Sequence, residues 1–384
     1  KWDEENYGRE YDLDLFNIVA VDDFNMGAME NKGLNIFNSS YVLAKPETTT
    51  DDNFEVVEAV IAHEYFHNWT GNRITCRDWF QLCLKEGLTV FRDAEFTADQ
   101  RSSAVKRIKD VILLKSRQFR EDGGPLSHPV RPESFVEINN FYTLTVYEKG
   151  AELVGMIKRL VGDKAYREAL DLYFDTYDGQ AVTIEDWIKV FEDVTKLNLS
   201  QFLLWYQQAG TPTLSVSESW ENNFLKLSFH QEIPDTPEQC NKKPHLMPVD
   251  MGLLDKTSGE VIHSESLKVS ETKEEFIFGP YSERPIPSLL RDFSAPVILK
   301  QNINKERLAF IFKHETDNFN RWDAGRKLCE NSLINTISKG APPDNLYLES
   351  LNKLISDDTL DPAFRALTLS LPSQDEMTQK CLEN

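Results

Sequence analysis

Two kinds of hydrophobic period divide the chain into regions. Up to about residue 210, most apolar residues recur every three or four positions, which predicts amphipathic helices. We expect these helices at 52–69, 83–98, 104–119, 147–160, 163–177, 183–195 and 200–208. Two early runs, 11–21 and 34–43, are rich in Leu, Ile, Val and Phe and are typical of strands. The first region is therefore predicted to be mostly helical with a small sheet.

The period changes after Gly210-Thr211-Pro212. Short runs of alternating hydrophobic and polar residues follow, separated by turn residues. The predicted strands are 213–216, 224–229, 246–254, 261–269, 276–278 and 296–299. From about residue 304 the helical period returns. We therefore predict three domains: a mostly helical domain (1–210), a β-sandwich (211–302) and a helical array (303–384).

The helix predicted at 52–69 carries the strongest chemical signal. Asp52, with Glu55 three residues later, resembles a capping pair at its start. Residues four apart on a helix lie about 40° apart around its axis, so His63 and His67 share one face. Apolar residues surround much of this helix, so we expect it to be buried and its polar groups to have partners.

The two histidines belong to the sequence His63-Glu64-Tyr65-Phe66-His67, and Glu86 follows nineteen residues after His67. Two histidines and one carboxylate leave the fourth position of a tetrahedral zinc open for water, as in catalytic zinc sites. Glu64 is placed to take a proton from that water. A chance HExxH in a chain of this length has a probability of roughly one in a hundred. The sequence therefore predicts a metal-dependent hydrolase.

Asp93 and Tyr147 each have two interpretations. Asp93 falls on the same helix face as Glu86, seven residues later, and is suited equally to orient a ligand imidazole or to form a surface salt bridge. A tyrosine hydroxyl near the metal can donate to the oxyanion that forms when water attacks a carbonyl. For Tyr147 taken alone, however, a packing role is favoured.

The segment Asn25–Gly33, between the two predicted strands, also has two interpretations. Its small residues Gly27 and Ala28 would let an extended ligand pair with a strand edge, with Glu30 just beyond. Gly and Asn are common turn residues, so the segment taken alone favours a turn.

Composition and charge narrow the function classes. The chain has 384 residues, of which 40% are hydrophobic and 11% aromatic, enough for sizeable cores. The net charge of −21 opposes binding to nucleic acid or to an anionic membrane. No apolar run approaches the ~18 residues of a membrane span. Five widely spread cysteines without a CxxC pair predict reduced thiols and a cytoplasmic location.

Taken together, these motifs resemble the M1 family of zinc aminopeptidases. The resemblance is carried by Gly27-Ala28-Met29-Glu30-Asn31, by His63 to His67, by Glu86 and by Tyr147, in collinear order over essentially the whole chain. It implies a multi-domain α+β fold: a thermolysin-like zinc catalytic domain, a β-sandwich and the start of an all-α helical-repeat domain. Members of the family carry a further domain before the catalytic one and a longer last domain. We therefore expect this chain to be a piece of a longer protein.

The resemblance also implies roles for single residues. His63, His67 and Glu86 would hold one Zn²⁺ per chain. Glu64 would be the general base and then the proton donor to the leaving amine, and Tyr147 would stabilise the oxyanion. The implied substrate-binding residues are Met26, Gly27, Ala28, Met29, Glu30, Asn31, Tyr41, Asn139 and Tyr142.

Within this set, Glu30 would bind the free α-ammonium of a peptide, which implies an exopeptidase of the alanyl type. A buried carboxylate left unpaired is costly, so peptides without a free ammonium should fit poorly. The flexible side chain of Met26 is consistent with tolerance of neutral and basic first residues. The implied partners are peptides with a free amine, without nucleic acid or membrane, and we expect the full-length form to be a monomer.

Two other functions stay open from the sequence. A family relative with epoxide-hydrolase activity would carry Gly where this chain has Ala28, which argues modestly against that activity. A zinc-free or inactive binding homologue is disfavoured because Glu64, both histidines, Glu86 and Tyr147 are all present.

Overall fold

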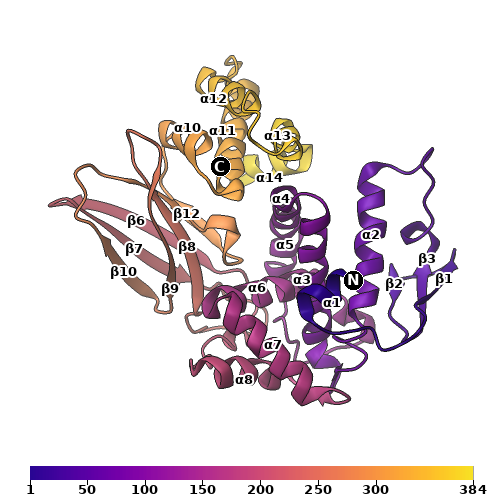
Figure 1. Ribbon diagram of the computed structural model, residues 1–384. Coiled ribbons are helices and arrows are strands. Elements are labelled where there is room, and N and C mark those ends of the chain that lie inside the picture. The colour runs from indigo at the N-terminus through magenta and orange to yellow at the C-terminus, as the bar shows by residue number, and fades with distance from the viewer. Residues whose placement is uncertain (384) are drawn as a thin grey trace. The chain divides into compact units, whose positions relative to one another are not determined.

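The computed structural model describes residues 1–383 (Figure 1). The chain divides into two compact units, each with its own hydrophobic core. The first unit comprises residues 1–103, 120–210 and 236–240. The second comprises residues 104–119, 211–235 and the chain from Asn241 onward. Within the described residues, no helix is long and apolar enough to cross a membrane.

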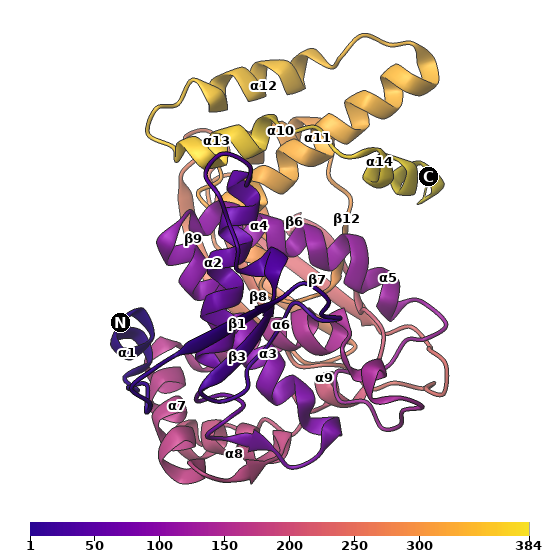
Figure 2. The same ribbon diagram turned by 90° about the vertical axis from the view of Figure 1, so that its right-hand side faces the viewer.

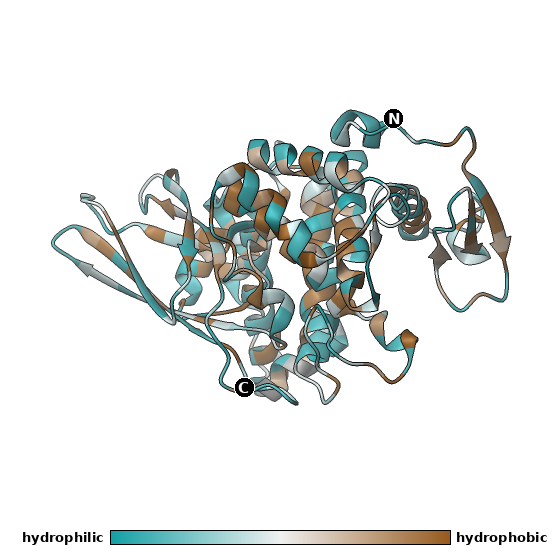
Figure 3. Cartoon of the chain, turned by 90° about the horizontal axis from the view of Figure 1, so that it is seen from below, coloured by the Kyte–Doolittle hydropathy of each residue, from teal (hydrophilic) through white to brown (hydrophobic). Residues whose placement is uncertain are grey.

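Three long helices form the centre of the first unit. They are α2 (Asp51–Phe66), α3 (Leu82–Gln100) and α6 (Gly150–Val161), and α3 contacts both of the others. Other elements of this unit are α1 (Trp2–Tyr7), β4 (Thr75–Cys76), α5 (Phe119–Asp122), a π-helical segment (Thr145–Lys149), α7 (Asp163–Tyr177), β5 (Ala181–Val182), α8 (Ile184–Thr195) and α9 (Leu204–Gln207). Hydrophobic residues form stripes along the helices, with hydrophilic residues between them (Figure 3). These stripes meet in a core that includes Leu88, Ile157 and Trp187.

α3 and α6 approach each other closely at a pair of glycines. A Cβ atom on Gly87 would lie 2.7 Å from the carbonyl carbon of Gly150 and 2.9 Å from its Cα, closer than real Cβ atoms come. Only glycine at position 87 therefore lets the two backbones pack at this distance. The crossing fixes Glu86, next to Gly87, relative to Tyr147, three residues before Gly150.

A three-stranded sheet with the order β1 (Asn17–Val21), β3 (Leu34–Asn38), β2 (Ala28–Met29) lies beside α2 (Figure 2). β1 runs parallel to β3, whereas β2 is antiparallel to it, with Ala28 opposite Phe37. The segment Asn25–Gly33 therefore combines both interpretations, because Ala28 and Met29 form a short edge strand, with a bend before it at 25–27 and a turn after it at 32–33.

The second unit contains a β-sandwich. One sheet has the order β10 (Lys273–Phe278), β7 (Phe224–Glu232), β6 (Thr213–Glu221), β12 (Ile298–Gln301), and the other has the order β11 (Ile286–Leu289), β8 (Met247–Leu254), β9 (Val261–Val269). Along β7, burial alternates from residue to residue, so Leu225 and Leu227 face the core while Lys226 does not. Leu214 of β6 and Met251 of β8 are fully buried, so both sheets contribute to this core.

Helices complete the second unit. They are α4 (Ser103–Leu113) with a π-helical segment (Leu114–Gln118), α10 (Lys305–His314), α11 (Asn318–Lys339), α12 (Asn345–Ile355), α13 (Pro362–Leu369) and α14 (Gln374–Glu383). α11 contacts each of the other helices from α10 to α14. Five of these helices begin with a side-chain cap, from Asn304, Asp317, Asp344 and Asp361 at the starts of α10 to α13 and from Ser373 at the start of α14.

The predicted order of a helical region with a small sheet, a β-sandwich and a helical array is confirmed, while the bounds of the three domains stay a prediction. Several element bounds were wrong. The strand predicted at 11–21 begins only at Asn17, because Tyr11 and Phe16 pack on Tyr65 instead. The strand predicted at 34–43 ends at Asn38, and the helix predicted at 200–208 is reduced to α9.

Two expectations about α2 were also wrong. Its cap is Thr50, whose hydroxyl accepts from the Asn53 amide, and not the pair of Asp52 and Glu55. Only Ala62, Glu64 and Phe66 of this helix are buried, so its apolar surface is only partly covered by the described residues.

Candidate metal and peptide site

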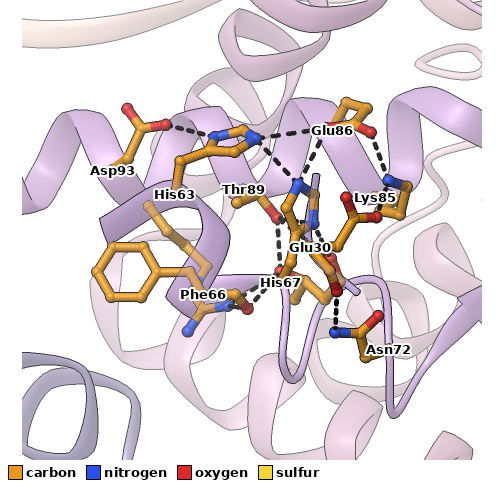
Figure 4. A network of polar contacts seen from close by, with 11 residues as sticks. Glu30, His63, Phe66, His67, Asn72, Lys85, Glu86, Thr89 and Asp93 are labelled. Atoms are coloured by element: carbon orange, nitrogen blue, oxygen red, sulfur yellow. Dashed lines mark hydrogen bonds and ion pairs between the residues drawn. The ribbon is translucent and has the colours of Figure 1, made fainter. Parts of the chain in front are cut away.

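α2 and α3 bring together the three predicted metal ligands (Figure 4). The Nε2 atoms of His63, in the last turn of α2, and of His67, the residue directly after this helix, are 2.9 Å apart. Glu86 on α3 places Oε2 at 3.1 Å from Nε2 of His67 and 3.5 Å from Nε2 of His63. The three ligand atoms therefore converge on one point.

The hydrogen bonds at the far side of each imidazole fix which ring nitrogen faces that point. Nδ1 of His63 lies 2.7 Å from Oδ2 of Asp93, and Nδ1 of His67 lies 2.8 Å from the Thr70 carbonyl oxygen. Both partners accept, so each Nδ1 carries a proton and each Nε2 presents its lone pair inward. This answers the open question about Asp93, which contacts a predicted ligand and is not a surface ion pair.

The converging lone pairs require a cation between them. Two imidazole nitrogens and a carboxylate oxygen would repel one another at these distances unless a proton or a metal ion lies among them. Burial by itself lowers the pKa of His63, but hydrogen bonds with Asp93 and Glu86 raise it to about 10. The same arrangement that favours a proton suits a divalent metal, and two histidines with one carboxylate match the ligands of catalytic zinc. The residues present therefore fit a zinc ion.

Glu64 lies on α2 beside the ligands and is buried. Burial raises the pKa of its carboxyl above the ordinary value, although the two histidines oppose this shift. Among the described residues, Oε2 of Glu64 has no hydrogen-bond partner. A buried carboxylate oxygen without a partner is a group suited to accept a proton from a bound molecule.

Glu30 follows the edge strand β2, and its carboxylate lies near His67 and Glu64. Its backbone oxygen accepts from Asn72 Nδ2 at 2.9 Å, which anchors the end of the strand. Oε1 of Glu30 accepts a hydrogen bond from the ammonium of Lys85. Lys85 is therefore a partner of this carboxylate that the sequence motifs did not reveal.

Tyr147 lies in the π-helical segment before α6. Burial, followed by the Glu86 charge and a hydrogen bond to Glu86, raises the pKa of its hydroxyl far above the ordinary value. The hydroxyl therefore stays protonated and can act as a donor. The ring of Tyr142 lies 6.3 Å from that of Tyr147, centroid to centroid.

The structure brings the other predicted substrate-binding residues together only in part. A Cβ atom on Gly27 would lie 3.7 Å from the Tyr41 ring, so these two residues are neighbours. Ala28 and Met29 form the edge strand β2. Met26, Asn31 and Asn139 are exposed, and none of the described contacts joins their side chains to the metal ligands.

Residues that sequence reasoning missed complete the surroundings of the site. The Thr89 hydroxyl lies 3.2 Å from Nδ1 of His67 and 2.7 Å from the Thr70 hydroxyl. Arg92, fully buried, donates to the Phe66 carbonyl and to the Thr70 hydroxyl. The only sequence signal for Thr89 and Arg92 is their position on the same helix as Glu86. Thr89 follows Glu86 by about one turn and Arg92 follows it by nearly two turns.

Comparisons with known proteins agree over the whole chain. The model of the peptidase family M1 domain matches residues 1–206, a domain with an Ig-like fold matches 210–302, and a domain of ARM repeats matches 305–384. These matches agree with the helical, sandwich and helical-repeat regions described above.

Curated relatives and a solved structure give the same result. Aminopeptidase N of Escherichia coli is 45% identical over 99% of this chain, and aminopeptidase N of Caulobacter vibrioides is 50% identical over 98%. The match covers 45% and 44% of those relatives, so this chain spans less than half of their length. The crystal structure of Legionella pneumophila aminopeptidase A in complex with aspartic acid superposes with a TM-score of 0.86 at 33% identity, over 98% of this chain and 43% of that one. Because the model of the peptidase family M1 domain matches residues 1–206, more than half of the chain, the chain belongs to peptidase family M1.

Proposed function

We propose that the whole protein is a zinc-dependent aminopeptidase that removes the first residue from peptides with a free amine. The observation that carries the proposal is the convergence of the Nε2 atoms of His63 and His67 and Oε2 of Glu86 on one point. Glu64 and Glu30 lie beside this point, and one metal ion per chain would be held there.

The metal, when bound, would polarise the scissile carbonyl and make water a stronger acid. Glu64 then takes a proton from the attacking water and later gives it to the leaving amine. Its raised pKa, caused first by burial, brings it nearer the range in which it can both accept and return a proton.

Tyr147 donates a hydrogen bond to the oxyanion that develops on the attacked carbonyl. Its hydroxyl stays protonated because burial and the Glu86 charge raise its pKa. A donor held in place before the reaction stabilises the developing charge without reorganisation, which is worth about 3 to 4 kcal/mol where one such donor has been removed.

Glu30 selects the substrate. It lies at the end of the edge strand β2, where a peptide bound in extended form along Gly27 and Ala28 would place its first residue. A carboxylate at this end pairs with the α-ammonium and fixes which amide bond reaches the metal. Exposed Met26 and the Tyr41 ring next to Gly27 are suited to contact the first side chain, and we expect broad specificity.

A pair of chromogenic substrates tests this proposal on the whole protein. We expect cleavage of alanyl and leucyl amides and at least about 100-fold slower cleavage of their N-acetylated forms, because only the free amine pairs with Glu30. Glu64→Gln should keep its zinc and lose about 10² to 10⁴ in kcat. The proposal is wrong if the zinc-loaded protein cleaves neither amide, or if Glu64→Gln is as active as the wild type.

A further inference from the structure

Lys85 lies inside the site, and the sequence motifs gave it no role. Its side chain is 12% exposed, and its Nζ contacts Oε1 of Glu30 and, at 2.5 Å, Oε1 of Glu86 (Figure 4). One ammonium thus touches both the carboxylate proposed to bind the substrate amine and the carboxylate proposed to bind the metal.

The position of Lys85 is built into the fold. The stem of the side chain lies against Gly71, where an added Cβ would come within 2.9 Å of Lys85 Cδ and also within 2.9 Å of His67 Nδ1. Gly71 adopts a φ of 151°, which side chains rarely adopt, and leaves room for both residues. The ammonium is therefore held between the two carboxylates by packing as well as by charge.

The two oxygens of Glu86 face different partners. Oε2 faces the histidine pair, whereas Oε1 faces Lys85. An ammonium on Oε1 keeps that oxygen away from the metal, so Glu86 would bind through Oε2 alone. Partners of metal ligands that act in this way fix the orientation of the ligand.

The charges of the site support a second effect. Glu30, Glu64, Glu86 and Asp93 supply four carboxylates, against which Lys85 supplies one positive charge. A divalent metal and a substrate ammonium would bring the sum to zero, so the complete site is neutral only when Lys85 is charged. Among the described residues Oε2 of Glu30 has no donor, so one of its oxygens is left for the substrate amine.

We propose that Lys85 is a positioning residue that couples the two halves of the site: it holds Glu86 toward the metal by one oxygen and shares Glu30 with the substrate ammonium. This inference rests on the proposed function. Removing the Lys85 charge then has two opposite effects. The metal is held less well and the turnover falls, whereas Glu30 is freed for the amine, which binds more tightly.

Two variants of the whole protein separate this role from a structural one. Lys85→Met keeps an apolar stem against Gly71 and removes the charge, and Lys85→Arg keeps both the stem and the charge. Lys158→Met is the matched control. Lys158 lies on α6 and pairs with Glu95, which is on α3, the helix that also carries Lys85, but outside the site. Thermal unfolding of each variant checks that it is folded.

The first readout is zinc release to an excess of chelator, which needs no substrate. We expect about 10- to 100-fold faster release from Lys85→Met than from the wild type. Lys85→Arg and Lys158→Met should release zinc close to the wild-type rate. Equal release from Lys85→Met and the wild type would overturn the inference.

The second readout is competitive inhibition by a simple primary alkylamine and by the alcohol of the same length. We expect the amine to inhibit Lys85→Met about tenfold more tightly than the wild type, with the alcohol unchanged and with kcat and KM for alanyl amide both reduced. Weaker amine binding in Lys85→Met would also overturn the inference. If the zinc-loaded wild type cleaves no amide, the proposed function fails, while zinc release still tests the contact between Lys85 and Glu86.

Discussion

At the scale of single residues, each predicted metal ligand has a partner outside the recognised motifs, and helical spacing indicated only one of these partners, Asp93. His63 is held by a carboxylate and His67 by a backbone carbonyl, through the ring nitrogen that faces away from the metal point. A carboxylate partner makes the imidazole a stronger ligand than a neutral carbonyl does. Loss of the Asp93 carboxylate should therefore lower the metal affinity more than loss of the carbonyl partner of His67.

Asp93→Asn tests this difference. The amide can keep a hydrogen bond to Nδ1 of His63 but lacks the charge, so we expect zinc affinity to fall by about 10- to 100-fold with little change in stability. Asp99→Asn is a matched control, because Asp99 lies on the same helix and pairs with Trp2. Zinc titration against a competing chelator measures both variants, and equal affinities would contradict the orienting role of Asp93.

The site was predictable from the sequence where spacing within one helix determines the geometry. His63 in α2 and His67 at the end of this helix are four residues apart, and because the backbone at His67 is still helical, their imidazoles lie side by side as expected. The spacing of Asp93 from Glu86 indicated an orienting role but left a surface salt bridge equally open, because that role depends on how α3 lies against α2. The role of Lys85 also depends on where Glu30 lies after β2, and this contact between elements leaves no periodic signal in the sequence. The same holds for Glu30, whose partner Lys85 is 55 positions away.

At the scale of elements, the crossing of α3 and α6 determines how Glu86 on α3 lies relative to Tyr147, just before α6. The backbone contact between Gly87 and Gly150 lies next to Glu86 and close to Tyr147. A change here should therefore affect both stability and catalysis, without touching any reacting group.

Gly87→Ala tests this crossing. The added Cβ would meet Gly150 backbone atoms at 2.7 and 2.9 Å, which cannot give way as a side chain can, so we expect a loss of about 1 to 3 kcal/mol of stability. We also expect a lower kcat, because Glu86 shifts relative to Tyr147. Gly155→Ala on α6 is the control, since its Cβ would meet the Phe91 ring at an ordinary 3.5 Å. Thermal unfolding and amide hydrolysis that are the same for both variants would contradict this explanation.

The start of α11 gives a prediction about pH. Asp317 caps this helix by accepting from the amides of Asn320 and Asp292, yet burial raises the pKa of its carboxyl to about 6 from an ordinary 3.8. Between these values the folded state holds the proton more tightly than the unfolded state. The stability from this group is therefore present below about pH 3.8 and is lost as the pH rises toward 6.

Asp317→Asn should remove that loss. We expect a gain of about 1 to 2 kcal/mol in the local stability of α11 above pH 6 and little change near pH 4, because the amide still caps the helix. Hydrogen exchange of the α11 amides in this variant and in the wild type, compared at each pH, measures this change in local stability. Asp344→Asn should instead lower the local stability at neutral pH, because the hydrogen bond from Lys305 lowers the pKa of Asp344 and so stabilises the folded state when this carboxylate is charged. No gain for Asp317→Asn at neutral pH would contradict the effect of burial.

Element bounds show where hydrophobic patterns are misleading. The apolar run from Tyr11 to Phe16 reads as a strand, but its aromatic side chains pack on α2 and never enter the sheet ladder. Strand β11 was missed because it contains Pro287, which breaks a strand pattern but is tolerated on an edge strand such as this one. The helix predicted at 183–195 agrees to within one residue with α8, whose start is capped by Thr183 together with Asp186 in the first turn.

At the scale of the whole molecule, the chain combines the M1 peptidase domain with an Ig-like and a helical-repeat domain, over less than half the length of its curated relatives. The residues proposed for the chemistry, from Glu30 to Tyr147, all lie in the first unit. Metal binding should therefore depend on this unit, and the central claim is that one metal held by His63, His67 and Glu86 makes the protein an aminopeptidase.

The most direct test is a titration of zinc into the whole protein after a chelator has removed its metal, followed by release of the chromophore from an alanyl amide. We expect no cleavage without metal and a linear rise that stops at one zinc per chain. Glu64→Gln should bind the same amount of zinc and stay inactive, since only the general base is lost. Cleavage that persists after metal removal, or one bound zinc per chain without cleavage, would contradict the account.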